Sequence, residues 1–198
     1  MAKLILLRHL KSQWNLENRF TGWTDVPLSK EGIENAKEVA DKLMGLQIDK
    51  VYTSPLIRNR ETTSLILENL GKKDLPIVID KALDERNYGK LQGLNKEEVK
   101  KQYGEEQVQL WRRSWNQAPP EGESLKDVYG RAVSFFREYI EKDLESGKNI
   151  LVVASHNSLR ALVKYIEKIS EDDIINLEIP YGGLSAYEFG EGIYKKLK

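Results

Sequence analysis

The chain has 198 residues, with 31 lysines and arginines, 31 aspartates and glutamates, two histidines and no cysteine. This length predicts one domain over residues 1–198, and the composition is typical of a globular protein. The lack of cysteine excludes disulfides and thiolate metal sites, and no apolar run is long enough for a signal peptide or membrane span. We therefore expect a cytoplasmic protein with no membrane partner, and no nucleic-acid partner because the charge has no basic surplus.

Short apolar runs alternate with helical patterns along the chain. Residues 4–7 and 150–154 are continuous apolar runs, as expected for strands buried on both faces of a mostly parallel sheet. Residues 51–53 and 77–79 resemble shorter strands of the same kind. Strands that alternate with helices predict an α/β protein, with a three-layer α/β/α arrangement and right-handed crossovers.

Capping residues mark the predicted helices. Ser29 is the expected N-cap of a helix whose apolar face includes Ile33 and Met44. Ser54, followed by Pro55, is expected to open a second helix that ends near residue 70.

Two further helices follow in the second half of the chain. Ser124 and Asp127 form a start like a capping box, and a last helix begins at about Asn157. Residues 81–120 do not fit the alternation of strands and helices. We expect them to form a small cap or active-site insertion.

The two histidines follow the two longest apolar runs directly, as His9 and His156. Ligands of open α/β sheets bind outside the carboxyl ends of the strands, so both imidazoles are expected in one crevice. The plainer alternative is that each ring is a hydrogen-bonded residue without a chemical role. Because both of the only two histidines hold equivalent positions, we favour the shared site.

Cationic residues point to an anionic ligand. Arg8 is delivered to the same crevice, and the planar guanidinium fork suits phosphate. The free backbone N–H groups at the start of the last helix add a second anion-binding element. The sequence has no zinc-type HExxH pattern, so we expect no metal. It also lacks the glycine-rich loops that are typical of nucleotide sites.

These residue types favour phosphoryl transfer. A neutral imidazole is a competent nucleophile toward phosphorus, and cations spread the charge of the transferred group. An oxygen leaving group also needs a proton, for which Glu85 is a candidate general acid.

Four blocks of sequence resemble the histidine phosphatase superfamily. The first contains Arg8, His9, Ser12 and Asn15, and the last is His156–Arg160. The other two cover residues 18–29 and residues 85–113, and they are similar to stretches typical of the branch of 2,3-bisphosphoglycerate-dependent phosphoglycerate mutases.

The resemblance implies a phosphoglycerate mutase-like fold and a role for each matching residue. His9 would be the phosphorylated nucleophile, with Arg8, Arg58 and His156 as its phosphate pocket and Glu85 as the acid and base. The residues that the resemblance implies for substrate binding are Arg8, Ser12, Asn15, Thr21, Gly22, Arg58, Glu85, Tyr88, Lys96, Arg112, Arg113 and Asn157.

The activity implied by the family is the glycolytic and gluconeogenic interconversion of 3-phosphoglycerate and 2-phosphoglycerate. It proceeds through a phosphohistidine without metal, and 2,3-bisphosphoglycerate is both intermediate and primer. The expected partners are small phosphorylated three-carbon acids. The protein is expected to be a monomer or a small homo-oligomer.

The chain departs from the family pattern at four places near the site. Leu10 replaces a glycine and is expected to crowd the phosphate pocket, and Lys11 is expected to add a cation near it. Asn87 replaces a histidine, and a glycine missing after His156 leaves the register of Asn157 open by one residue.

Two other functions stay open at this point. One is a metal-independent histidine phosphatase acting on small phosphate esters, which is favoured by the short stretch at residues 119–124 and by the lack of the long carboxyl-terminal tail that covers the site in many mutases. The other is a non-catalytic anion-binding relative, which is favoured by Leu10.

Overall fold

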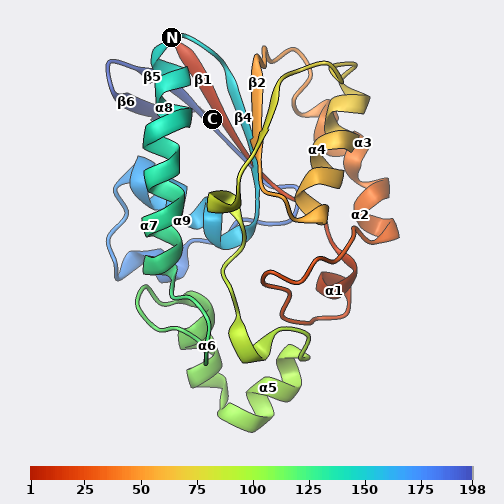
Figure 1. The fold of residues 1–198 in the computed structure, drawn as a ribbon, viewed down its shortest axis with the longest axis vertical. Helices are drawn as coiled ribbons and strands as arrows, with labels where there is room; N and C mark the ends of the chain where they lie inside the picture. Colours follow the sequence, from red (N-terminus) through yellow and green to blue (C-terminus); the bar gives the residue numbers. More distant parts are fainter. Residues whose placement is uncertain (198) are drawn as a thin grey trace.

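A six-stranded mixed sheet forms the centre of the computed structural model, which describes residues 1–197. The sheet order is β3-β2-β4-β1-β5-β6 (Figure 1). The first four strands run parallel to one another, whereas β5 and β6 are antiparallel additions at one edge. The strands are β1 (Ala2–Arg8), β2 (Lys50–Thr53), β3 (Ile77–Ile79), β4 (Ile150–Ala154), β5 (Leu184–Gly190) and β6 (Ile193–Lys196).

Apolar side chains on both faces explain why the central strands form. Along β1, Leu4 and Leu6 pack on one face of the sheet, whereas Ile5 and Leu7 pack on the other. Strand side chains alternate between faces, so a strand covered on both faces is apolar at successive positions. The central strands predicted from apolar runs are confirmed as β1, β2 and β4.

Two parts of the sheet differ from the sequence prediction. β3 is not buried on both faces, because it lies at an open edge where Ile77 and Ile79 are 43% and 50% exposed. β5 and β6 form a hairpin that was not predicted. In β5 only Tyr187 and Phe189 are buried, so this strand lacks the unbroken apolar run that revealed β1.

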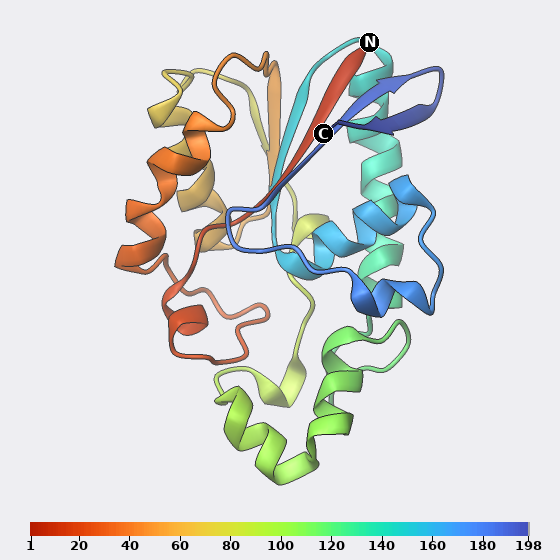
Figure 2. The ribbon, with the colours of Figure 1, turned by 180° about the vertical axis from the view of Figure 1, so that it is seen from behind.

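Helices cover both faces of the sheet and complete three layers (Figure 2). One face carries α7 (Leu125–Phe135), α8 (Glu141–Glu145) and α9 (His156–Glu167), and a π-helical segment, Phe136–Ile140, joins α7 to α8. The other face carries α2 (Lys30–Glu34), α3 (Ala36–Asp41) and α4 (Ile57–Asn69). The predicted three-layer α/β/α arrangement with a mostly parallel sheet is confirmed.

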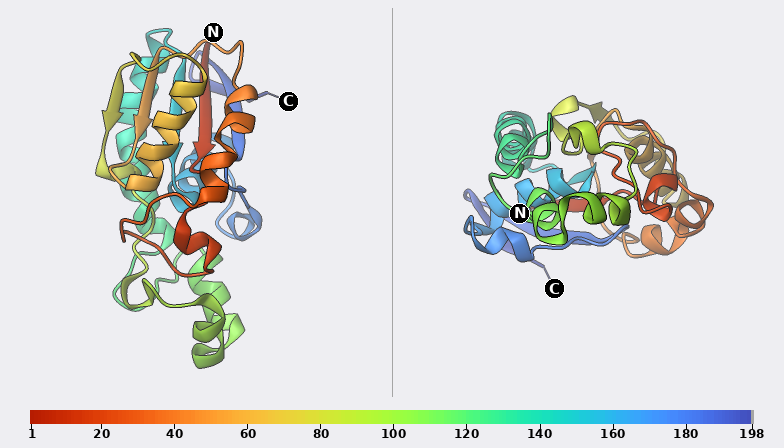
Figure 3. Two further views of the ribbon diagram at one scale, coloured as in Figure 1. Left: turned by 90° about the vertical axis from the view of Figure 1, so that its right-hand side faces the viewer. Right: turned by 90° about the horizontal axis from the view of Figure 1, so that it is seen from below.

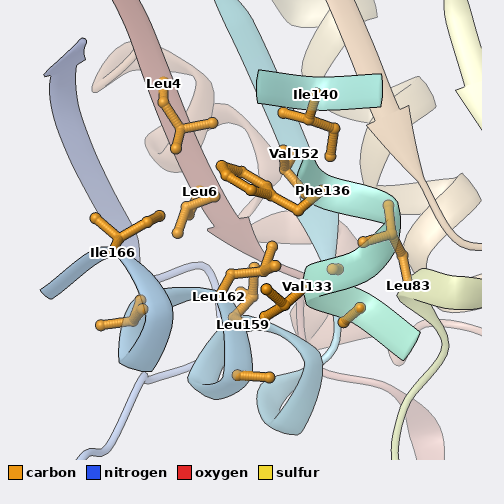
Figure 4. Packing of buried hydrophobic residues seen from close by; sticks show 14 of the residues in the cluster. Leu4, Leu6, Leu83, Val133, Phe136, Ile140, Val152, Leu159, Leu162 and Ile166 are labelled. Atoms are coloured by element: carbon orange, nitrogen blue, oxygen red, sulfur yellow. The ribbon is translucent and has the colours of Figure 1, made fainter. Parts of the chain in front are cut away.

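The larger apolar cluster joins the sheet to the layer of α7, α8 and α9 (Figure 4). Phe136 is fully buried and points toward Leu6 of β1 and Val152 of β4. Burial of a side chain of this size contributes about 1.5–3 kcal/mol. Leu159 and Leu162 of α9 belong to the same cluster. The packing therefore fixes the helix that begins at the second histidine.

Residues 81–120 form a cap, as expected, but they are more helical than expected. Helices α5 (Lys96–Tyr103) and α6 (Glu105–Arg113) project beyond the carboxyl ends of the parallel strands (Figure 3). Phe20, Leu91, Val99, Val108 and Trp111 form a small apolar cluster within the cap. The shorter elements are α1 (Gln13–Leu16) and the 3-10 turns Lys81–Leu83, Gly89–Leu91 and Asp173–Asn176.

The helix predicted after Ser29 begins as expected but is broken in two. The Ser29 hydroxyl accepts a hydrogen bond from the backbone N–H of Gly32, as an N-cap does. The chain then breaks at Asn35 between α2 and α3. Ile33 and Met44 are 48% and 67% exposed, so the prediction of one apolar face containing both residues was wrong.

The other helix starts give one confirmation and one correction. Ser124 caps α7 in a complete capping box, as predicted. α4 begins at Ile57 rather than directly after Ser54. The Ser54 hydroxyl instead accepts hydrogen bonds from Leu56 N and Asn59 Nδ2, which holds the loop before the helix.

No helix within residues 1–197 has the length and apolar character needed to cross a membrane.

Alanine substitutions at two helical glycines are expected to change the free energy of unfolding in opposite directions. A methyl group at Gly32 would lie 2.2 Å from the Lys11 carbonyl oxygen, whereas one at Gly130 in α7 would meet nothing within 4 Å. We expect Gly130→Ala to raise the free energy of unfolding by about 0.5–1 kcal/mol, because alanine has the higher helix propensity. Gly32→Ala should lower it. Urea denaturation measures both values, and a stabilising Gly32→Ala would show that α2 does not press on the loop after β1.

Candidate active site

A cavity of about 270 Å³ lies at the carboxyl ends of β1 and β4. Its lining contains six cationic side chains and two carboxylates. The parallel register pairs Arg8 with Ala154, so the histidines that follow the two strands meet at this cavity. The predicted site residues in the lining are Arg8, His9, Asn15, Thr21, Gly22, Arg58, Glu85, Tyr88, Lys96, Arg112, Arg113, His156 and Asn157.

His9 is buried, and the backbone carbonyl group of the next residue holds its ring in one orientation. Its Nδ1 lies 2.6 Å from the carbonyl oxygen of Leu10, so we assign the proton to Nδ1 and the lone pair to Nε2. Burial, followed by the positive charges of Arg58 and Arg8, holds the pKa of His9 well below its usual value. The imidazole is therefore neutral at neutral pH, which is the nucleophilic form.

Arg8 offers a buried donor to this cavity. Its Nη1 donates to the carbonyl oxygen of Ile179 at 2.5 Å, and its guanidinium lies over the ring of Tyr181, 3.8 Å from the ring centroid. Within residues 1–197, Arg8 Nε and Thr21 Oγ1 are buried without a hydrogen-bond partner. A buried donor left unpaired costs about 1–3 kcal/mol, so an anion that accepts from Arg8 would be stabilised. Both residues line the cavity.

Arg58 is buried and is held by backbone carbonyl groups. Its Nη2 donates to the oxygen of Gly22 at 2.7 Å, and its Nη1 donates to the oxygen of Thr24 at 3.1 Å. Gly22 has a φ of +55°, and a Cβ there would lie 2.1 Å from Gln92 Oε1. Only glycine therefore fits this turn without a shift, and the turn aligns the carbonyl group that holds the arginine.

His156 is the first residue of α9 and lies beside a carboxylate. Its Nε2 is 3.3 Å from Glu178 Oε1 and 3.4 Å from the backbone nitrogen of Ile179. Burial lowers the pKa of His156 to about 4, although the hydrogen bond with Glu178 acts in the opposite direction. Burial acts to raise the pKa of Glu178, but its contacts with His156 and Arg113 outweigh burial and lower it to about 2.

Glu85 occupies the amino-terminal end of α9. Its Oε1 accepts hydrogen bonds from Asn157 N at 3.2 Å, Asn157 Nδ2 at 2.9 Å and Arg86 N at 2.7 Å. Burial acts to raise the pKa of Glu85, but His156, Arg58 and these hydrogen bonds outweigh it, so the pKa lies below its usual value. The backbone N–H of Asn157 is therefore paired with Glu85 rather than free for a substrate anion, which corrects the expectation at that position. The register of Asn157 is now clear, since its side chain faces Glu85.

Ser12 is the one predicted binding residue that does not line the cavity. It is fully buried, and its hydroxyl donates to Asn15 Oδ1 at 2.8 Å. The backbone N–H of Ser12 donates to the same oxygen at 3.2 Å. Ser12 therefore orients the amide of Asn15, which does reach the cavity.

Three departures from the family pattern also point away from the cavity. Leu10 is fully buried in the apolar cluster on the α2, α3 and α4 side of the sheet, so the expectation that it crowds the pocket was wrong. Lys11 does not add a cation to the site, because its Nζ lies 3.0 Å from Glu31 outside the cavity. The Oδ1 of Asn87 accepts a hydrogen bond from Gly89 N, which holds the cap turn.

The cavity lining contains five residues that the sequence analysis did not assign to it, namely Arg19, Phe20, Glu178, Pro180 and Tyr181. The last three precede β5, which pairs antiparallel with β1. A strand antiparallel to β1 begins where β1 ends, so the segment before it lies beside His9. A prediction of β5 would have placed Glu178, Pro180 and Tyr181 beside His9.

Two buried arginines outside the cavity hold the end of α6. Arg86 Nη2 donates to the carbonyl oxygen of Arg112 at 2.6 Å. Arg160 of α9 donates to the oxygen of Arg113 at 2.8 Å and to that of Ile174 at 2.7 Å. Both arginines are fully buried. They place the last turn of α6 beside α9, with the side chains of Arg112 and Arg113 in the cavity lining.

Comparisons with known proteins identify the family. The sequence model of the histidine phosphatase superfamily, branch 1, matches residues 4–197. The chain belongs to this superfamily. It is 41% identical to a 2,3-bisphosphoglycerate-dependent phosphoglycerate mutase of Chlamydia muridarum, over 99% of this chain and 97% of the relative. It is 46% identical to a protein of Gloeobacter violaceus called 2,3-bisphosphoglycerate-dependent phosphoglycerate mutase 2, over 95% of this chain and 86% of the relative.

Solved structures of the superfamily share the fold. A mycobacterial glucosyl-3-phosphoglycerate phosphatase matches with a TM-score of 0.87 and 24% identity, over 99% of this chain and 97% of that one. A structure called mycobacterial hydrolase 1 matches with a TM-score of 0.88 and 22% identity, over 100% of this chain and 98% of that one. At these identities the likeness shows the three-layer fold alone.

The buried neutral His156 predicts a loss of stability in acid. The unfolded chain gains a proton on this residue near its ordinary pKa of 6.5, whereas the folded chain does so only near 4. The stability from this difference is complete above about pH 7 and is lost as the pH falls, and the loss reaches about 3 kcal/mol by pH 4. Urea unfolding at pH 7 and pH 4 should show a loss larger by about 3 kcal/mol in the unmodified protein than in His156→Gln. Equal losses would show that His156 titrates normally in the folded chain.

Proposed function

We propose that this chain is a 2,3-bisphosphoglycerate-dependent phosphoglycerate mutase that interconverts 3-phosphoglycerate and 2-phosphoglycerate. The proposal is carried by one observation, a neutral His9 in a cavity lined by six cationic side chains. The two relatives of 41% and 46% identity support it, since both bear the name of this activity and match nearly the whole chain. The proposal also covers the natural substrates, which are small phosphorylated three-carbon acids.

The charge and size of the cavity suit such an acid. A volume of about 270 Å³ is below the usual range of sites for drug-sized ligands. Arg8 and Arg58 flank His9 and would hold the phosphoryl group that is transferred. The remaining anionic groups of the substrate would be held by Lys96, Arg112 and Arg113, together with the polar groups of Asn15, Thr21, Gly22, Tyr88 and Asn157.

His9 would carry the phosphoryl group between two oxygens of the substrate. The lone pair on Nε2 attacks phosphorus of a bound phosphate ester, and the P–O bond to the ester oxygen breaks as the N–P bond forms. The phosphohistidine then donates the phosphoryl group to the 2-hydroxyl of 3-phosphoglycerate. The same nitrogen takes back the phosphoryl group from the 3-position, which leaves 2-phosphoglycerate. Arg8 and Arg58 stabilise the charge on the phosphoryl oxygens in both transfers. When bound, 2,3-bisphosphoglycerate supplies the phosphoryl group that first loads His9.

Glu85 would move the proton in each transfer. Its carboxylate is ionised in the resting site, so it is ready as the base that takes the proton of the attacking hydroxyl group. The same carboxyl group returns that proton to the leaving oxygen in the second transfer. The negative charge of bound phosphate raises its pKa toward the value that this exchange requires.

The decisive experiment follows 2-phosphoglycerate and inorganic phosphate together. Purified protein is incubated with 3-phosphoglycerate, with and without catalytic amounts of 2,3-bisphosphoglycerate. We expect 2-phosphoglycerate to form only with the primer, and His9→Ala to abolish its formation. Release of phosphate without 2-phosphoglycerate would identify a phosphatase instead. Absence of both products, with binding retained, would identify an anion-binding relative.

A second experiment tests the proton transfer. Glu85→Gln keeps the side-chain size but removes the proton acceptor, so kcat should fall by about 10²–10⁴-fold, with a smaller change in KM. Glu121→Gln is the matched control, because Glu121 pairs with Lys90 on the cap surface, where both side chains are about two-thirds exposed. Steady-state kinetics of the three proteins measures the effect. An unchanged kcat in Glu85→Gln would exclude the carboxylate from the reaction.

A further inference from the structure

Glu178 places a carboxylate among the groups that would meet the substrate. Its Oε1 lies 3.3 Å from His156 Nε2 and 3.8 Å from Arg8 Nη1. Its Oε2 forms an ion pair with Arg113 Nη1. One carboxylate thus lies within 4 Å of three groups of the cavity lining.

The backbone beside Glu178 is anchored, whereas its side chain is half exposed. The carbonyl oxygen of Ile179 accepts from Arg8 Nη1 at 2.5 Å, and the N–H of Ile179 points at His156 Nε2. Ile179 is 7% exposed, so this segment is anchored in the site. The Glu178 side chain is 52% exposed, while that of Arg113 is 18% exposed. Rotation of the carboxylate into solvent therefore needs no backbone movement, and exposed side chains rotate within nanoseconds.

The Glu178 carboxylate is placed to compete with a substrate anion for the same cations, rather than to form a permanent structural ion pair. Arg113 needs an anionic partner, because a largely buried cation without one is costly. The Arg160 side chain donates to the Arg113 carbonyl oxygen and so holds the end of α6, and Glu178 is therefore not required for that. An anionic substrate entering the cavity is repelled by the Glu178 carboxylate until that group leaves.

We propose that Glu178 is an internal competitor for the substrate's anionic groups, holding Arg113, Arg8 and His156 in the empty site and rotating into solvent when an anionic substrate binds. The nature of that substrate rests on the proposed function. The competition weakens substrate and product binding alike, because the carboxylate returns to its partners when the ligand leaves. Its effect therefore belongs to KM and to dissociation constants more than to kcat.

Direct binding measurements test this proposal without any turnover. Calorimetric titration measures the dissociation constant of 3-phosphoglycerate for two proteins, the His9→Ala variant and the double variant that also carries Glu178→Gln. We expect binding to become about tenfold tighter, the size of one charge-assisted interaction released to the ligand. Glu31→Gln is the matched control, because Glu31 also pairs with a cation close to the site but outside the cavity. Unchanged or weaker binding in Glu178→Gln would overturn the proposal.

A second readout reports the contact itself. In the His9→Ala protein His156 is the only histidine, so its ring protons can be titrated alone by NMR. Glu178→Gln should lower the pKa of His156, because the hydrogen bond that the imidazole donates to the carboxylate acts to raise it. Glu178→Asp, which keeps the charge but shortens the side chain, should also tighten binding. With unchanged thermal unfolding, unchanged or weaker binding in either variant would contradict the competition.

The two proposals fail separately. Tighter binding of 3-phosphoglycerate by Glu178→Gln, without any production of 2-phosphoglycerate by the unmodified protein, would keep the competition and reject the mutase activity. Production of 2-phosphoglycerate with no change in binding would do the reverse. In the active protein, Glu178→Gln should lower KM by a factor similar to the gain in affinity.

Discussion

The parallel pairing of β1 with β4 is the constraint on which the site depends. The register sets Arg8 opposite Ala154, and the backbone N–H of His9 donates to the Ala154 carbonyl oxygen at 3.1 Å. The pairing therefore continues to the nucleophile itself. Both strands are buried on two faces, so His9 and the start of α9 are held by the core rather than by a mobile loop. Sites built on such elements keep their geometry more accurately than sites on loops.

Backbone carbonyl groups hold two of the cavity's cations, and one of them, Arg8, also lies 3.8 Å from the Glu178 carboxylate. Arg58 is bound by the carbonyl oxygens of Gly22 and Thr24, and Arg8 by that of Ile179. Carbonyl dipoles stabilise a guanidinium and leave its net positive charge in place. A carboxylate, in contrast, would cancel that charge. The same positive charges then serve two purposes, because they attract an anion and keep the His9 imidazole in its nucleophilic form.

The part of the site that follows strand ends was predictable from the sequence, because buried parallel strands and their carboxyl ends have a clear pattern. His9 and His156 were placed together for this reason. The position of Glu178 was not, because β5 has only one deeply buried face and gives no continuous apolar signal. Leu10 was misjudged for a different reason. Its residue type suggested a blocked pocket, whereas the direction of its side chain depends on packing against helices that are distant in sequence.

Arg160 has a consequence for how ligands enter and leave. It belongs to α9, the helix that carries His156, and it donates to the carbonyl oxygen of Arg113 at the end of the cap helix α6. A partly buried hydrogen bond therefore joins the helix of His156 to the cap. Rotation of the half-exposed Glu178 side chain, as proposed above, admits a ligand without breaking this bond. Opening by this route takes nanoseconds, whereas hinge closure of a domain takes microseconds to milliseconds. Access is thus far faster than the millisecond to second turnover typical of enzymes.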